Sequence, residues 1–168
     1  FKEKKGGKFN EYFYEHVFQL ILRLKGNYLW PAMWSSSFST DGVEMPTASA
    51  ELADEYGIVM GTSHHEPMMR AHQEWSKGKS NYGSGEWNYS TNKEGLQKFF
   101  CEGAERNGKY ENVVTVGMRG DGDAPMLPEG SSVEENIELL KENITDQKKI
   151  LKDNGLEDNA KVLALYKE

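Results

Sequence analysis

The stretch Val113-Val114-Thr115-Val116-Gly117-Met118, followed directly by Arg119-Gly120-Asp121-Gly122-Asp123, points to the fold class of this chain. Its first six residues are uncharged and rich in β-branched side chains, which is typical of a buried strand. The five residues that follow carry one cation and two carboxylates. A buried strand that ends in a charged cluster is typical of parallel α/β proteins, whose functional groups gather where strands end.

Three other segments predict strands. The aromatic run 27–34 is one, although Pro31 cannot donate to a strand ladder and marks the end of the strand or a bulge. Residues 58–62 form the second, and the third covers 162–166. The strand at 58–62 runs straight into His64-His65-Glu66, so polar side chains follow a strand end here as well.

Between the strands, apolar residues recur every three or four positions, which predicts amphipathic helices. The predicted helices cover residues 9–24, 46–56, 67–75, about 91–104 and 132–154. Thr91 with Glu94, and Ser132 with Glu135, form capping boxes at the start of the last two helices. The stripe that the first helix is expected to bury consists of Phe9, Phe13, Val17, Leu20 and Leu24.

Alternating strands and helices predict an α/β fold with a parallel sheet covered by helices. Four strands cannot close a (β/α)8 barrel of about 250 residues, so the sequence fits either a small open doubly wound sheet or part of a barrel. Polar or aromatic clusters at the strand ends favour the barrel, because barrel active sites are assembled from several strand ends. We therefore expect a partial (β/α)8 TIM-like barrel with about four parallel strands, and a single partial catalytic domain over residues 1–168. Since the chain begins with Phe1 and stops with a predicted strand, we expect an excerpt truncated at both ends.

Charge and cysteine content narrow the function. The 168 residues include 20 Lys and Arg against 27 Asp and Glu, a net charge of -7, which argues against a nucleic-acid partner. The one basic cluster is explained as a solvated tail and consists of Lys2, Lys4, Lys5 and Lys8. A single cysteine, Cys101, excludes an internal disulfide and thiolate zinc sites, so a metal would need His and carboxylate ligands. The most apolar stretch, 17–24, is too short to span a membrane.

The string His64-His65-Glu66 is the first candidate site. A zinc deaminase would need a downstream Pro-Cys-x-x-Cys, and a zincin would need a histidine where Met69 stands, so both motifs fail. A looser metal site of histidines and carboxylates that involves His72 stays open. So does a structural role, in which buried histidines satisfy backbone groups near the sheet.

The string 119–123 is the second candidate. It lacks the third acidic position and the distal glutamate of an EF-hand, and its glycines match no phosphate-binding motif. Its glycines allow close backbone approach to a ligand, although a plain surface turn would use Asp and Gly equally well.

Aromatic residues at strand ends and in the loop 77–90 are the third signal, because flat apolar faces with polar rims suit sugar rings. They are Tyr28, Trp30, Trp34, Trp75, Tyr82, Trp87 and Tyr89. Together with the carboxylates and histidines, they predict acid-base hydrolysis of a polar, anionic carbohydrate. The cations that could pair with such a substrate are Arg119, Arg70, His64, His65 and Lys167.

Three strings, at 27–34 (Asn-Tyr-Leu-Trp-Pro-Ala-Met-Trp), 57–68 (Gly-Ile-Val-Met-Gly-Thr-Ser-His-His-Glu-Pro-Met) and 117–123 (Gly-Met-Arg-Gly-Asp-Gly-Asp), carry a family resemblance. In this order they resemble glycoside hydrolase family 115, the xylan α-1,2-glucuronidases. The resemblance runs from about Phe9 to Glu168.

The resemblance implies a (β/α)8 catalytic barrel within a larger, secreted or periplasmic enzyme that needs no cofactor. Such an enzyme removes glucuronic acid or 4-O-methylglucuronic acid from glucuronoxylan or aldouronic oligosaccharides with inversion, which requires two carboxyls about 6.5 to 9.5 Å apart. Carried over by motif, the catalytic candidates are Asp121, Asp123 and Glu168. The implied substrate-binding residues are His64, His65, Glu66, Arg119, Trp30 and Trp34. The family's upstream Asn-Asp-Glu string and a downstream tyrosine are not in this chain, and the acid and base roles stay unassigned.

Two other functions remain open from the residues alone. A non-catalytic carbohydrate-binding protein would use Trp34, Trp87 and Tyr89 as platforms for sugar rings. A metal-dependent barrel hydrolase would lose its activity to a chelator.

Overall fold

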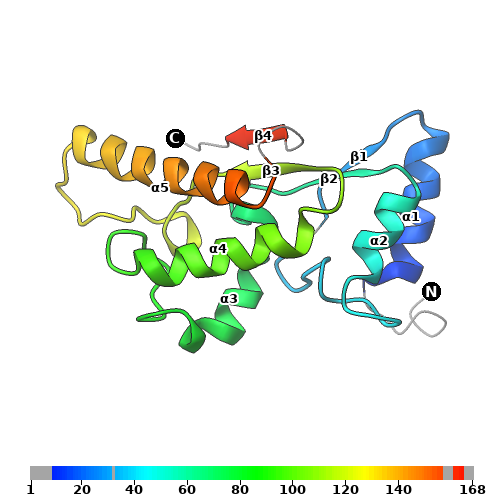
Figure 1. Cartoon of the computed structure of the whole chain (residues 1–168), viewed down its shortest axis with the longest axis horizontal. Coiled ribbons are helices and arrows are strands. Elements are labelled where there is room, and N and C mark those ends of the chain that lie inside the picture. Colours follow the sequence, from blue (N-terminus) through cyan, green and yellow to red (C-terminus); the bar gives the residue numbers. More distant parts are fainter. Residues whose placement is uncertain (1–8, 32, 157–160, 165–168) are drawn as a thin grey trace.

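A four-stranded parallel sheet organises the chain (Figure 1). The computed structural model describes residues 9–31, 33–156 and 161–164. The strands are β1 (Tyr28–Leu29), β2 (Val59–Gly61), β3 (Asn112–Val116) and β4 (Lys161–Ala164). Each pairs in parallel with the next one along the chain, in the order β1-β2-β3-β4.

This strand order separates the two folds that the sequence left open. A doubly wound sheet reverses its strand order at a switch point, whereas the strands of a (β/α)8 barrel follow one another around the sheet. The order of the four described strands has no reversal. The fold is therefore α/β with the arrangement of a partial barrel, as predicted.

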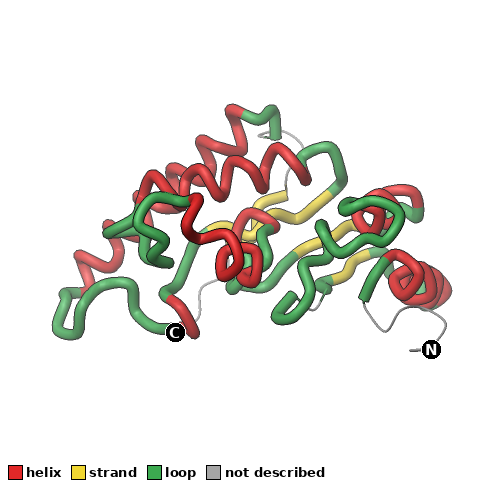
Figure 2. The backbone as a smooth tube through the Cα atoms, turned by 90° about the horizontal axis from the view of Figure 1, so that it is seen from below, coloured by secondary structure: helices red, strands yellow, loops and turns green. Residues whose placement is uncertain are grey.

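Within the described residues, the α-helices are α1 (Glu11–Arg23), α2 (Ala48–Glu55), α3 (His72–Gly78), α4 (Lys93–Asn107) and α5 (Val133–Asp153). Helix α1 packs against α2, and α4 packs against α5. Figure 2 shows the two pairs at opposite ends of the molecule, with the strands running between them. Three short 3-10 turns, η1 (Pro67–Met69), η2 (Lys79–Asn81) and η3 (Asp121–Asp123), lie in the loops.

Two predictions about helices are wrong, for different reasons. The predicted helix 67–75 is split into η1 and α3, because Met68 and Met69 adopt left-handed conformations with φ of 58° and 60°. The predicted capping box at Thr91 does not form, since α4 starts at Lys93 and the Thr91 hydroxyl donates instead to Glu86. The box at Ser132 and Glu135 is confirmed.

The strands are shorter than the patterns indicated. Of the predicted run 27–34, only Tyr28 and Leu29 pair with β2, in keeping with the missing donor at Pro31. The last predicted strand, 162–166, appears as β4 at 161–164, and residues 165 and 166 lie outside the described residues.

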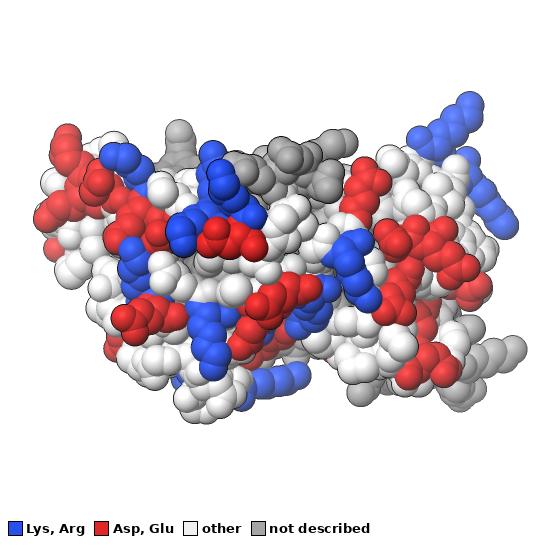
Figure 3. Space-filling model, in the orientation of Figure 1, with Lys and Arg blue, Asp and Glu red and all other residues white. Residues whose placement is uncertain are grey.

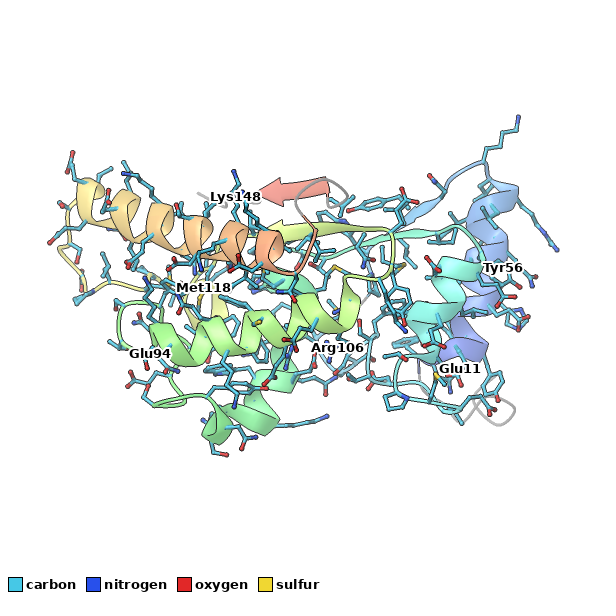
Figure 4. All side chains as sticks on the ribbon, viewed as in Figure 1. Glu11, Tyr56, Glu94, Arg106, Met118 and Lys148 are labelled. Atoms are coloured by element: carbon cyan, nitrogen blue, oxygen red, sulfur yellow. The ribbon has the colours of Figure 1, made fainter. Side chains whose placement is uncertain are left out.

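The core is aromatic, and its largest fully buried side chains are Tyr89, Phe18, Phe38, Phe99 and Phe100. The stripe predicted for α1 is only partly correct. Phe9, Leu20 and Leu24 of that stripe are exposed, while Tyr14 and Phe18 face the core. Glu11 opens the helix from a buried position and accepts hydrogen bonds from the backbone N–H groups of Val43 and Glu44 (Figure 4).

Charges on the face seen in Figure 3 are mixed, with acidic side chains beside most of the basic ones. That face presents no broad basic surface of the kind that neutralises a phosphate backbone. Within the described residues, no helix combines the length and the apolar character needed to cross a membrane.

Candidate active site

Two loops that follow neighbouring strands meet at one edge of the sheet. The loop after β2 carries His64, His65 and Glu66, and the loop after β3 carries 119–123. The Thr115 hydroxyl, on β3, donates to the Thr62 carbonyl at 2.7 Å and joins the two loops at their base. The meeting of strand ends that the sequence predicted is thus present.

The loop after β3 is held from behind by Gln147 on α5, which is fully buried. Its Oε1 accepts a hydrogen bond from Gly117 N at 2.6 Å, and its Nε2 donates to Gly117 O at 3.3 Å. Gly117 has a φ of 96°, a conformation that a side chain would strain. The chain therefore leaves the sheet at this glycine along a path fixed by one amide side chain.

Asp123 is the centre of a charged cluster. Its Oδ1 lies 3.0 Å from His64 Nε2, and its Oδ2 lies 3.8 Å from His65 Nε2. Arg119 reaches the same residue twice, with Nε 3.5 Å from Oδ1 and Nη2 donating to the Asp123 carbonyl at 2.7 Å. About a fifth of the Asp123 side chain (21%) is exposed, so solvent screens these contacts only in part.

His65 is the histidine whose titration the site alters. Burial lowers the pKa of its imidazole below the ordinary 6.5, the neighbouring His64 lowers it further, and Asp123 and Glu66 act in the opposite direction. The imidazole rings of His64 and His65 are 4.1 Å apart, centroid to centroid. The centroid of the Trp34 ring lies 5.0 Å from that of His65, with the two rings in an edge-to-face arrangement. At neutral pH His65 is therefore mostly uncharged and able to accept a proton.

Glu66 is buried at the back of the same loop. The Ser63 hydroxyl donates to its Oε2 at 2.5 Å, and the Thr62 hydroxyl donates to its backbone carbonyl at 2.7 Å. These contacts fix the direction of the carboxylate, which lines the site.

His72, Asp121 and Trp87 form a second side of the site. His72 Nε2 lies 3.2 Å from Asp121 Oδ1, but the Asp121 side chain is 78% exposed. The ring of Trp87 stands edge-on to His72 at 5.3 Å, and its indole N–H donates to the Arg119 carbonyl at 3.0 Å. The loop 77–90, which was singled out for its aromatic residues, thus reaches the charged cluster.

Both sides surround a depression of about 70 Å³. It is lined by Trp34, His64, His65, Glu66, His72, Trp87, Arg119, Gly120, Asp121 and Gly122. Of the residues proposed from sequence, the structure brings together His64, His65, Glu66, Arg119, Asp121, Asp123 and Trp34. Glu168 and Lys167 lie outside the described residues.

Three of the candidate residues stand elsewhere. The indole N–H of Trp30 donates to the Tyr28 hydroxyl beside Gly61, and Trp30 does not line the depression. Tyr89 is buried and donates to Asp146, so it offers no platform for a sugar ring. Arg70 is buried under η1, 3.8 Å from the centroid of the Phe99 ring and paired with carboxylates of α3 and α4.

The sequence predicts for His72 only a role as a metal ligand, and it does not predict that His72 lines the depression. A histidine that opens a helix gives no periodic signal that could have revealed it. Trp87 was named as a platform from its position in the loop, and its contact with Arg119 came only from the structure.

Metal binding can be tested on the same geometry. His64, His65 and Asp123 could each offer one ligand atom, all within 4.8 Å of one another, and His72 does not join this group. The guanidinium of Arg119 already faces Asp123, however. A divalent cation at this position would be repelled by the positive charge of Arg119. These residues therefore suit a proton or an anionic ligand better than a metal ion.

Comparisons with known proteins bear on this arrangement. A family model described as Glycosyl hydrolase family 115 matches residues 1–168. Among solved structures, a family GH115 4-O-methyl-α-glucuronidase with specificity for decorated arabinogalactans is similar, with 30% sequence identity and a TM-score of 0.71. That match covers 86% of this chain and only 18% of the other. No curated protein matches the chain.

Proposed function

Since the chain belongs to glycosyl hydrolase family 115, we propose that it supplies part of the active site of a glucuronidase. The enzyme would release glucuronic acid or 4-O-methylglucuronic acid from the side chains of a plant polysaccharide. One observation carries the proposal: a carboxylate, Asp123, is held by two histidines and an arginine that themselves line a depression with aromatic walls.

Of the two aspartates of this loop, Asp123 is the better catalytic candidate. Three side chains orient it, and the pairing with Arg119 favours its deprotonated form, which is the form in which a general base acts. Asp121 is mostly exposed and touches His72 alone among the ion pairs found in the described residues. We assign the general base to Asp123 and a lesser, positioning role to Asp121.

The uronate group of the substrate needs a cationic partner. Arg119, which lines the depression, offers this charge. In an inverting mechanism, a second carboxyl acts as general acid about 6.5 to 9.5 Å from the base. We propose for this role Glu168, the remaining catalytic candidate that the family resemblance carries over.

Two polysaccharides are candidates for the substrate. The family resemblance proposes glucuronoxylan with α-1,2-linked side chains. The similarity to an enzyme whose title names decorated arabinogalactans supports an arabinogalactan main chain as the second candidate.

The first experiment is proton NMR of the complete protein with glucuronoxylan and, separately, with a uronic-acid-decorated arabinogalactan. We expect a uronic acid to appear from one of them, with the β-anomer first, because inversion of an α-linkage gives the β-sugar. A glycan that binds with no release of uronic acid would contradict the proposal and favour the carbohydrate-binding alternative. Loss of activity in EDTA would favour the metal-dependent one.

Substitution in the complete protein tests the assignment of the base. Asp123→Asn should lower kcat by about 10²- to 10⁴-fold, the usual effect of removing a general base. Asp121→Asn is the matched control, because it makes the same change two residues away in a mostly exposed side chain. A loss in Asp121→Asn as large as that in Asp123→Asn would refute the assignment, provided that circular dichroism shows both variants folded.

A further inference from the structure

A groove of about 560 Å³ lies beside the depression, on its α3 side. Helix α3, the loop that follows it and the residues before α4 form its walls. The residues that matter here are His72, Ser76, Lys79, Trp87, Thr91 and Asp121.

The groove and the depression are neighbours. His72, Trp87 and Asp121 line both, so a ligand that reaches from one to the other passes the His72–Asp121 pair. The Trp87 ring is fixed in place by its bond to the Arg119 carbonyl and by edge contact with Trp75 at 5.2 Å. At about 560 Å³, the groove falls within the range of about 300 to 1,000 Å³ that is typical of pockets for small ligands.

The walls of the groove carry the chemistry of a sugar-binding surface. An aromatic ring, Trp87, stands among exposed hydroxyl and charged groups. The Thr91 hydroxyl donates to Glu86 at 2.6 Å, which orients a hydrogen-bonding pair at the rim. Lys79 makes no ion pair within the described residues, and two carboxylates, Glu86 and Asp121, line the groove with it. One lysine against two carboxylates, together with hydroxyl groups, suits a neutral, hydroxyl-rich chain better than a polyanion.

We propose that this groove binds the main chain of the polysaccharide, at the sugar residues next to the one that bears the uronic acid. The inference rests on the proposed function, because it takes the depression as the place where the uronic acid lies. It adds the direction of the main chain, which leaves the depression past His72 and runs between α3 and the start of α4.

Affinity electrophoresis of the complete protein tests the groove without relying on catalysis. Glucuronoxylan or decorated arabinogalactan is cast into the gel, and migration is compared for the wild type and the double variant Lys79→Ala/Thr91→Val. Both side chains are exposed, so the fold should persist, which circular dichroism verifies. We expect about a fivefold to tenfold weaker retention. Lys77→Ala is the matched control, since Lys77 is an exposed lysine on α3 outside the groove and should change retention less than twofold.

The outcomes separate the groove from the reaction. No retention of the wild type, equal retention of the double variant, or an equal effect of Lys77→Ala would each overturn the groove. Weaker retention of the double variant with no release of uronic acid by the wild type would support the groove and refute the proposed function. Release of uronic acid with retention unaffected by the double variant would support the function and overturn the groove.

Discussion

At the scale of single residues, the groups around His65 influence its protonation. His65 is held in its neutral form by burial and by His64, and Asp123 resists that tendency. The folded chain therefore binds the His65 proton less tightly than the unfolded chain does. His65 therefore makes the folded state less stable at acidic pH. Its contribution to the free energy of unfolding is fully present above about pH 6.5 and decreases as the pH falls below that value.

This coupling predicts a titration. In the complete protein with ring-¹³C-labelled histidine, His65 should titrate below 6.5, and Asp123→Asn should lower its pKa further, since a carboxylate that favours the charged imidazole is lost. NMR spectra recorded from pH 5 to 8 measure both values, with the signal assigned from a His65→Asn variant. A pKa at or above 6.5 in the wild type, or a higher pKa in Asp123→Asn, would show that the environment of His65 is not the one described.

Much of the site at this scale could be predicted from the sequence. Polar residues that directly follow buried strands were expected to meet, and His64, His65 and Asp123 do so, because parallel strands bring their ends to one edge. The positions of Trp30 and Tyr89 away from the depression could not be predicted. Trp30 turns to the hydroxyl of Tyr28, beside Gly61 of β2, and Tyr89 is held by Asp146 of α5, far along the chain.

At the scale of secondary-structure elements, ion pairs between segments can override the helix that the apolar spacing of one segment predicts. The apolar spacing of 67–75 predicts one helix, yet the chain turns sharply at Met68 and Met69. The buried Arg70 explains this path, because it donates to the Phe99 carbonyl at 3.0 Å and pairs with Glu102, both on α4. On the same helix, Arg106 (labelled in Figure 4) donates two hydrogen bonds to the Glu74 carboxylate of α3, so α4 holds the segment 70–74. No pattern within 67–75 contains those partners.

Helix α5 also sets the geometry of the site, through Gln147. Gln147→Leu would leave the N–H and C=O of Gly117 without their partner, which should lower the free energy of unfolding by about 1 to 3 kcal/mol. It should also reduce kcat more than it raises KM, because the loop that holds Asp123 loses its fixed path. Chemical denaturation and uronic acid release from the complete protein provide the two measurements.

Two further substitutions calibrate that result. Gln147→Glu keeps the length and the acceptor atoms of the side chain but loses the donor, so its kcat should lie between those of the wild type and Gln147→Leu. Lys148→Ala changes the adjacent, exposed residue of α5 (Figure 4) and should alter neither quantity. Wild-type kcat in Gln147→Leu would mean that the loop is held by other contacts.

At the scale of the whole molecule, the described sheet is open. Strand β1 pairs with β2 on one side, and the described residues offer no strand on its other side. Large apolar side chains near this edge are exposed, among them Tyr28 (42%), Trp30 (42%) and Trp34 (74%). A second apolar surface lies at the start of α5, where Val133 is 69% and Ile137 is 58% exposed.

Open edges and exposed apolar groups promote association. We expect the isolated 168-residue chain to self-associate at micromolar concentration in sedimentation velocity experiments. Ile137→Lys and Val133→Lys together should reduce the association, because they place charge on one apolar surface without touching the sheet. A single, sharply defined monomer with a cooperative melting transition would show that the described part of the chain needs no covering partner.

The consecutive order β1-β2-β3-β4 has a consequence for how the protein is made. Each strand pairs with the one translated before it, and no strand must wait for a later one to fill a gap in the sheet. The sheet can therefore grow during translation from its N-terminal strand onward, one strand and one crossover at a time, while the ribosome is still adding residues. The transient hazard in such vectorial growth is the newest strand, whose outer edge stays unpaired until the next strand has left the exit tunnel.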